Sequence, residues 1–156
     1  MTDRDELYLR RTIKLALEAR SAGNMPDASL LVGPDGQILA EEYNTVVTER
    51  DICAHPELKL AQWAARELEA DVARATTLYT NCEPCTMCAG AIARSGLGRV
   101  VFALSLEQWE QIKAPGAISP DATQVQTEGP ALFDEARIPF DGWVDRPISR
   151  GASQHA

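Results

Sequence analysis

The spacing of hydrophobic positions predicts a first helix over residues 3–22, because apolar side chains recur there every three or four residues. Thr2 and Asp5 stand at the spacing of a capping box at its start. The residues predicted to face the core share one side of this helix: Leu9, Ile13, Ala16 and Leu17.

Short apolar runs predict the strands. Two of them, at 28–33 and 37–42, flank a Pro-Asp-Gly turn, and two more occupy 76–80 and 99–104. We expect the last run to be a buried strand that pairs parallel with the strand before it, across a helical crossover. Residues 44–54 are predicted to form a polar loop.

Two further helices are expected between these strands. One begins at Pro56, because proline suits the first helical position, and runs to about Ala70. The other begins near Cys85 and ends at Ser95 and Gly96. The first of these helices is predicted to turn four residues toward the core: Leu58, Ala61, Ala65 and Leu68.

The C-terminal third has a weaker pattern. It predicts a helix near 106–112, a loop over 115–120, a strand near 123–127 and a helix over 130–137, with a frayed tail at about 147–156. The alternation of helices and strands predicts an α/β fold, a three-layer sandwich in which helices cover both faces of a mixed central β-sheet. We expect one domain over residues 1–156.

The composition and net charge of the chain indicate which kinds of binding partner to expect. The chain has 156 residues, is 45% hydrophobic and 24% charged, and carries a net charge of −8, so it suits a globular protein with a small-molecule partner and disfavours nucleic acid. No apolar run approaches the roughly 20 residues of a membrane-spanning helix, and the N-terminus does not resemble a signal peptide. The four cysteines indicate reduced thiols in the cytoplasm.

Two short strings carry the chemistry. HPE is followed about thirty residues later by PCTMC, and this layout is the signature of zinc deaminases. One imidazole and two thiolates leave a fourth zinc position open for water, as catalytic sites do. The chain has only two histidines, and the other one is next to the C-terminus. The candidates are three zinc ligands and one acid that can move protons: His55, Cys85, Cys88 and Glu57.

Other interpretations of these residues stay open. Cys82, Cys85 and Cys88 have the spacing of iron–sulfur ligands, although only Cys53 could be the fourth and HPE would be unexplained. Glu57 could be an ordinary acid at a helix N-terminus. Asn44 could form a turn, and Asp27 could point to solvent.

The chain resembles the cytidine deaminase-like superfamily, most closely the branch of guanine deaminases and tRNA adenosine deaminases. The resemblance rests on YTNCEPCTMCAGAI, on the GRVVFAL that follows it, and on MPDASLLV nearer the N-terminus. It implies that His55, Cys85 and Cys88 bind Zn²⁺, that Glu57 shuttles protons and that Asn44 contacts the base. It also implies a homodimer.

Two residues depart from the family pattern. The middle residue of H-x-E is usually small and not proline, and in several members its N–H donates to the substrate ring, whereas Pro56 has no N–H. Asp27 stands where relatives carry an apolar residue beside the base. Replacing a donor by an acceptor disfavours cytosine-type substrates and favours guanine, another aminopurine or a triazine.

The sequence therefore predicts a zinc-dependent hydrolytic deaminase that converts the exocyclic amino group of a small nucleobase-like heterocycle to a carbonyl, with release of ammonia. The alternatives are a tRNA adenosine deaminase and a zinc-binding module of the same fold without catalysis.

Overall fold

The computed structural model describes residues 1–113 and 126–142. The chain divides into two compact units, Met1–Ala117 and Ile118–Ala156. The first contains the sheet and all the candidate site residues. The described part of the second contains α7 (Phe133–Ala136) and the 3₁₀ helix η2 (Ile138–Phe140). The single domain over residues 1–156 stays a prediction.

The first unit is built on a four-stranded mixed sheet with the order β2-β1-β3-β4. β1 pairs antiparallel with both of its neighbours, and β3 pairs parallel with β4, as predicted. The strands are β1 (Ala28–Val32), β2 (Ile38–Tyr43), β3 (Thr77–Cys82) and β4 (Arg99–Leu104).

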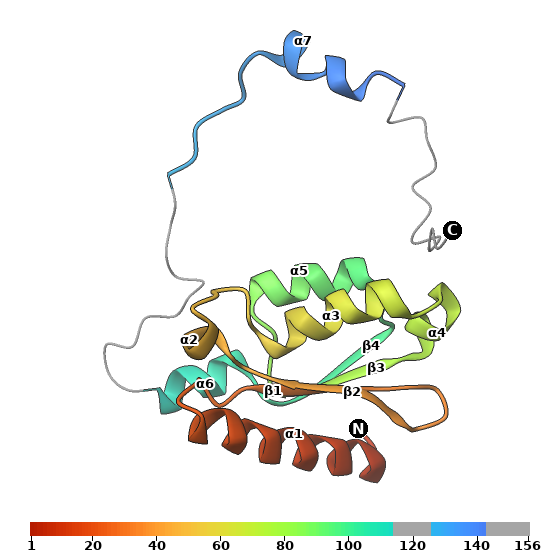
Figure 1. The fold of residues 1–156 in the computed structure, drawn as a ribbon, viewed down its shortest axis with the longest axis vertical. Helices are drawn as coiled ribbons and strands as arrows, with labels where there is room; N and C mark the ends of the chain where they lie inside the picture. The colour runs from red at the N-terminus through yellow and green to blue at the C-terminus, as the bar shows by residue number, and fades with distance from the viewer. Residues whose placement is uncertain (114–125, 143–156) are drawn as a thin grey trace. The chain divides into compact units, whose positions relative to one another are not determined.

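Helices cover both faces of this sheet, so the predicted fold class is confirmed. α1 (Asp3–Ser21) lies on one face, while α3 (Pro56–Glu67) and α5 (Thr86–Ser95) pack together on the other (Figure 1). α5 is the crossover that a parallel pair requires, since it connects β3 to β4. The remaining helices of this unit are α2 (Val46–Glu49), α4 (Ala70–Ala75) and α6 (Leu106–Ile112).

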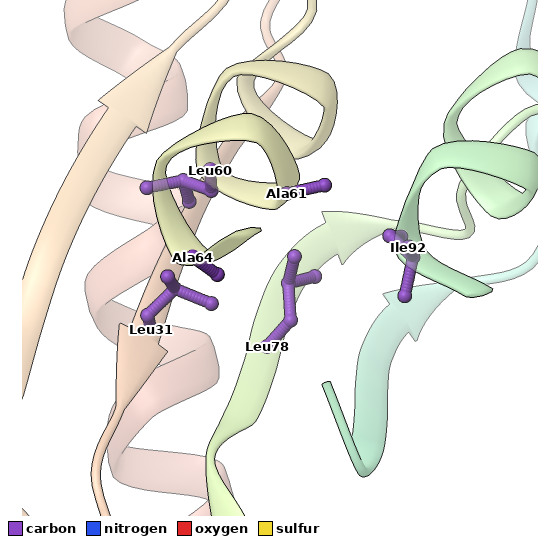
Figure 2. Close-up of a cluster of buried hydrophobic side chains, with 6 residues drawn as sticks. All are labelled: Leu31, Leu60, Ala61, Ala64, Leu78 and Ile92. Atoms are coloured by element: carbon purple, nitrogen blue, oxygen red, sulfur yellow. The ribbon is translucent and has the colours of Figure 1, made fainter. Parts of the chain in front are cut away.

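The main hydrophobic cluster lies between the sheet and the pair α3 and α5. Figure 2 shows its six side chains, which come from β1, β3 and both helices. The buried face of α3 differs from the predicted one: Leu60 and Ala64 are buried, whereas Ala65 is exposed. The buried side of α3 also includes Pro56 and Glu57 at its start, which the apolar spacing of the later residues did not include. The cluster consists of Leu31, Leu60, Ala61, Ala64, Leu78 and Ile92.

α1 also presents a different face from the predicted one. Leu9 and Ala16 are buried, but Ile13 is 46% exposed and Leu17 is 55% exposed. The buried stripe includes two polar side chains, and a pattern search for apolar residues skips those positions. The stripe is made of Asp5, Leu9, Thr12, Leu15, Ala16 and Ala19.

Asp5 explains why a charged residue belongs to that stripe. The predicted capping box with Thr2 is present. The Asp5 carboxylate also accepts hydrogen bonds from the Tyr79 hydroxyl at 2.7 Å and from the Arg99 guanidinium at 2.8 and 3.0 Å. The carboxylate therefore links α1 to β3 and β4, and the hydrogen bond from Arg99 is the main cause that lowers the pKa of Asp5.

We expect Asp5→Asn to lower the free energy of unfolding by about 1–3 kcal/mol at neutral pH, since hydrogen bonds to charged groups are worth that much. The pKa of Asp5 is lower in the folded protein than in the unfolded chain. Its stabilising contribution is therefore complete above about pH 4 and is lost as the pH falls further. Urea unfolding of both proteins at pH 7 and pH 3 should show the difference between them shrinking in acid. An equal difference at both pH values would contradict this account.

Several local predictions need correction. The predicted loop over 44–54 contains the helical turn α2, and the helix predicted to reach Ala70 ends at Glu67, before the separate α4. β4 is an edge strand in which only Val101 is buried, so it is not the buried strand predicted. Gly98, just before it, passes so close to α4 that an added Cβ would lie 1.8 Å from the carbonyl oxygen of Arg74.

The C-terminal predictions can be compared only in part. α6 agrees with the helix predicted near 106–112, and α7 is shorter than the helix predicted over 130–137. Of the strand predicted near 123–127, residues 126 and 127 are not in a strand. The rest of that strand, the loop over 115–120 and the tail at 147–156 lie outside the described residues. No helix in the described ranges is both long and apolar enough to cross a membrane.

Candidate active site

The N-termini of α3 and α5 position the candidate zinc ligands. His55 is the N-cap of α3 in an extended conformation, with Pro56 as the first helical residue, as the motif predicts. Cys85 is the N-cap of α5, and Cys88 lies in the first turn of that helix. Residues three apart share a helix face, so the two sulfurs face the same way.

These three side chains meet. Nδ1 of His55 lies 3.9 Å from Sγ of Cys85 and 3.6 Å from Sγ of Cys88. The three possible ligand atoms are all within 4.8 Å of one another, so one metal ion can bind to all of them. An imidazole and two thiols form a donor set that suits zinc. Cys82 and Cys53 are not part of this group, so the iron–sulfur alternative gains no support from the described residues.

Contacts within the group shift the pKa values of its three members. A hydrogen bond from Cys88, and then the contact with His55, lower the pKa of Cys85 to about 4. The hydrogen bond to Cys85 and burial raise the pKa of Cys88. The pKa of His55 is raised, first of all by its hydrogen bond with Cys85. A thiolate is already the form that a metal ion requires.

Glu57 points toward the same group. It is the second residue of α3, is only 4% exposed, and its carboxyl oxygen Oε2 lies 3.9 Å from Sγ of Cys88. Burial is the main cause that raises the pKa of Glu57 to about 7. A solvated acid at a helix N-terminus would be exposed and would favour its charged form, so this ordinary interpretation does not fit the structure.

Asn44 and Asp27 are held together beside this group. The backbone N–H of Asn44 donates to the carbonyl of Asp27 at 2.8 Å. The side-chain oxygen of Asn44 accepts from the N–H of Val46 at 3.1 Å, so Asn44 does form a turn. Its amide nitrogen Nδ2 is buried and has no partner among the described residues, so both of its N–H donors are left for another molecule.

Asp27 does not simply point to solvent. It is half-buried, and burial raises its pKa, opposed by the charge of His55 and assisted by that of Cys85. Glu57 and Cys82 also feel its charge. The charge of the Asp27 carboxylate therefore acts on the candidate ligands His55 and Cys85.

Asn81 was missed by the sequence reasoning. Its side chain accepts from the N–H of Ala28 at 2.7 Å and donates to the carbonyl of Pro26 at 2.9 Å. It therefore ties β3 to the segment on both sides of Asp27. The available signal was a polar residue inside a strand, two positions after Tyr79 and immediately before Cys82.

Comparison with known proteins agrees with this site. Residues 2–104 match the family described as the cytidine and deoxycytidylate deaminase zinc-binding region. A probable cytosine deaminase from Schizosaccharomyces pombe is 31% identical over 93% of this chain and 95% of its own length. A tRNA-specific adenosine deaminase from Bacillus subtilis is 39% identical over 63% of this chain, and the match spans only 60% of that relative.

A solved structure extends the similarity to the fold. The guanine deaminase from Bacillus subtilis is 26% identical, has a TM-score of 0.69, and is matched over 97% of this chain and 99% of that one. The match to the family covers the two helix starts that carry His55, Cys85 and Cys88. This chain belongs to the cytidine and deoxycytidylate deaminase family and is a zinc-dependent hydrolytic deaminase.

Proposed function

We propose that the protein deaminates a small nucleobase-like heterocycle and that guanine, another aminopurine or a triazine is its preferred class of substrate. The observation that carries the proposal is the buried, unpartnered amide nitrogen of Asn44. An unsatisfied buried donor costs about 1–3 kcal/mol, and an acceptor on a bound ring would remove that cost. The similarity to a guanine deaminase supports the same class.

Zinc binding and proton transfer are assigned to different residues of this chain. His55, Cys85 and Cys88 hold the zinc ion, which supplies Lewis-acid activation of water when it is bound. Glu57 takes one proton from the attacking water and delivers it to a ring nitrogen. It then moves the proton of the added hydroxyl group to the leaving amino group, as the carbonyl forms and the bond from carbon to nitrogen breaks. Oxygen from water replaces the amino nitrogen, so the products are a ring carbonyl and ammonia.

Pro56 narrows the choice of substrate. It is buried at the first position of α3, between His55 and Glu57, and its nitrogen has no hydrogen to donate. A ring carbonyl placed against this nitrogen would lose a hydrogen bond, which disfavours cytosine-type substrates.

The second candidate function is that of a tRNA adenosine deaminase, because the chain is similar to the tRNA-specific adenosine deaminase from Bacillus subtilis. The net charge of −8 opposes it, since binding to a nucleic acid depends on neutralising phosphates with basic side chains. A homodimer and a cytoplasmic location stay predictions.

Ammonia release from a panel of compounds tests the proposal. We expect the zinc-loaded protein to release ammonia from guanine or from another aminopurine or aminotriazine, with a higher kcat/KM than from cytosine. The panel should include the matching nucleosides and a tRNA whose anticodon carries adenosine, analysed for inosine. Preference for cytosine would overturn the proposed class of substrate, and inosine in tRNA alone would replace it with the second candidate. Absence of turnover with all of these compounds would also overturn the proposed class of substrate.

A further inference from the structure

We propose that Asp27 is a specificity-determining residue that accepts a hydrogen bond from a ring N–H or amino group of the substrate, and that Asn81 is the residue that positions it. This inference rests on the proposed function and deepens it. It assigns the substrate to heterocycles whose edge resembles an amidine or guanidine, with N–H donors beside a hydrogen-bond acceptor.

The position of Asp27 in the sheet directs its side chain toward the site. It immediately precedes β1, in which Leu31 belongs to the cluster beneath α3 and α5. Side chains alternate between the two faces of a strand, so Asp27 and Leu31, four residues apart, lie on the same face. That face carries α3 and α5, whose first residues hold the zinc ligands.

The Asp27 carboxylate is unpaired in the part of the chain that the structure describes. Among the described residues, no hydrogen bond or ion pair to its side chain is present, in contrast to the buried Asp5, which contacts both Tyr79 and Arg99. Glu41 is likewise paired with Arg11. A partly desolvated acid without a donor is costly, and a ligand N–H would remove that cost. Hydrogen bonds to an ionised acceptor are stronger than those between neutral groups.

Three hydrogen bonds fix the backbone around this carboxylate. Asn81 binds the carbonyl of Pro26 and the N–H of Ala28, and Asn44 donates its backbone N–H to Asp27 itself. Asn81 therefore fixes the residue before Asp27 and the residue after it. Its side-chain amide is occupied by these two bonds, so its effect on the substrate passes through Asp27.

Asp27 and Asn44 together provide a hydrogen-bond acceptor and a hydrogen-bond donor for the edge of a substrate ring. Asn44 offers a free N–H donor and Asp27 offers free carboxylate oxygens, and the two residues are joined by a backbone hydrogen bond. A ring edge that carries both an acceptor and an N–H donor is complementary to the pair. Guanine, other 2-aminopurines and aminotriazines have such an edge.

The test measures ligand binding as well as turnover. The probes are 2-aminopurine, followed by its fluorescence, and purine, which lacks the amino group and is measured by competition. Binding is measured on proteins that also carry Glu57→Gln, so that the amino group is not lost during the measurement. For zinc-loaded Asp27→Asn we expect the Kd of 2-aminopurine to rise about 10–100-fold and that of purine to change less than about threefold, because only the amino group loses its acceptor. Asp35→Asn, in an exposed turn, is the control and should match the wild type.

Asn81→Ala separates positioning from folding. We expect it to raise the Kd of 2-aminopurine about 3–30-fold with unchanged zinc content, and to add little to Asp27→Asn in the double variant, because both changes remove one contact. Equal Kd values of 2-aminopurine with and without Asp27→Asn would overturn the inference. Additive effects of the two substitutions in the double variant would overturn the positioning role of Asn81. If the binding difference is observed but the wild type releases no ammonia from any compound, the recognition stands and the proposed catalysis falls.

Discussion

Replacing Glu57 with glutamine is expected to reduce kcat at least about 10³-fold while zinc binding is retained. General acid–base catalysis contributes about 10²–10⁴-fold, and this reaction needs protons moved at both the attacking water and the leaving amino group. Glu57 is the buried acid next to Cys88, and glutamine has nearly the same shape without the ability to exchange a proton. The change should therefore act on the chemical step rather than on the fold.

The measurement is ammonia release under saturating substrate, with zinc content and thermal unfolding recorded on the same samples. Glu67→Gln is the matched control, since Glu67 is the exposed last residue of the same helix, and it should keep the activity of the wild type. Activity of Glu57→Gln within tenfold of the wild type would assign proton transfer to another group.

The parts of the fold that follow from local chemistry were predictable from the sequence. Pro56 begins α3, Thr2 and Asp5 cap α1, and an apolar run gives each strand of the sheet. Each of these features depends on neighbours in the sequence. A capping box or a proline in the first turn of a helix can therefore be identified from the sequence alone.

The faces of the helices were less predictable, because polar residues are buried in them. Asp5 and Thr12 complete the inner stripe of α1, and their burial depends on partners far along the chain. The partners of Asp5 are Tyr79 and Arg99, which lie on β3 and β4. A pattern of apolar spacing cannot include such positions, so it selected Ile13 in their place.

The same distinction applies to the candidate site. The zinc ligands belong to short motifs with a fixed spacing, and the structure brings them together as the motifs predict. Asn81 belongs to no motif, since its role is to bind the backbone on both sides of Asp27, more than fifty residues away. Only the register of β1 against β3 reveals that contact.

Replacing Cys88 with serine is expected to remove most of the bound zinc and nearly all activity. Cys88 is fully buried and is one of only three side chains that can hold the ion in the described residues, so its loss leaves two ligands. Metal binding to a folded site also stabilises the fold, so the variant should unfold at a lower temperature than the zinc-loaded wild type. Treating the wild type with a chelator should lower its unfolding temperature in the same direction.

Cys82→Ser is the control that makes the result specific. Cys82 is also buried and lies three residues before Cys85, but it does not belong to the group of side chains whose ligand atoms meet. We expect this variant to keep its zinc and its activity, measured by metal analysis after dialysis and by ammonia release. Loss of zinc from Cys82→Ser would place Cys82 among the ligands, and full zinc in Cys88→Ser would remove Cys88 from them. The helix start at Cys85, which aligns Cys85 and Cys88 on one face and leaves Cys82 in the strand, predicts the opposite.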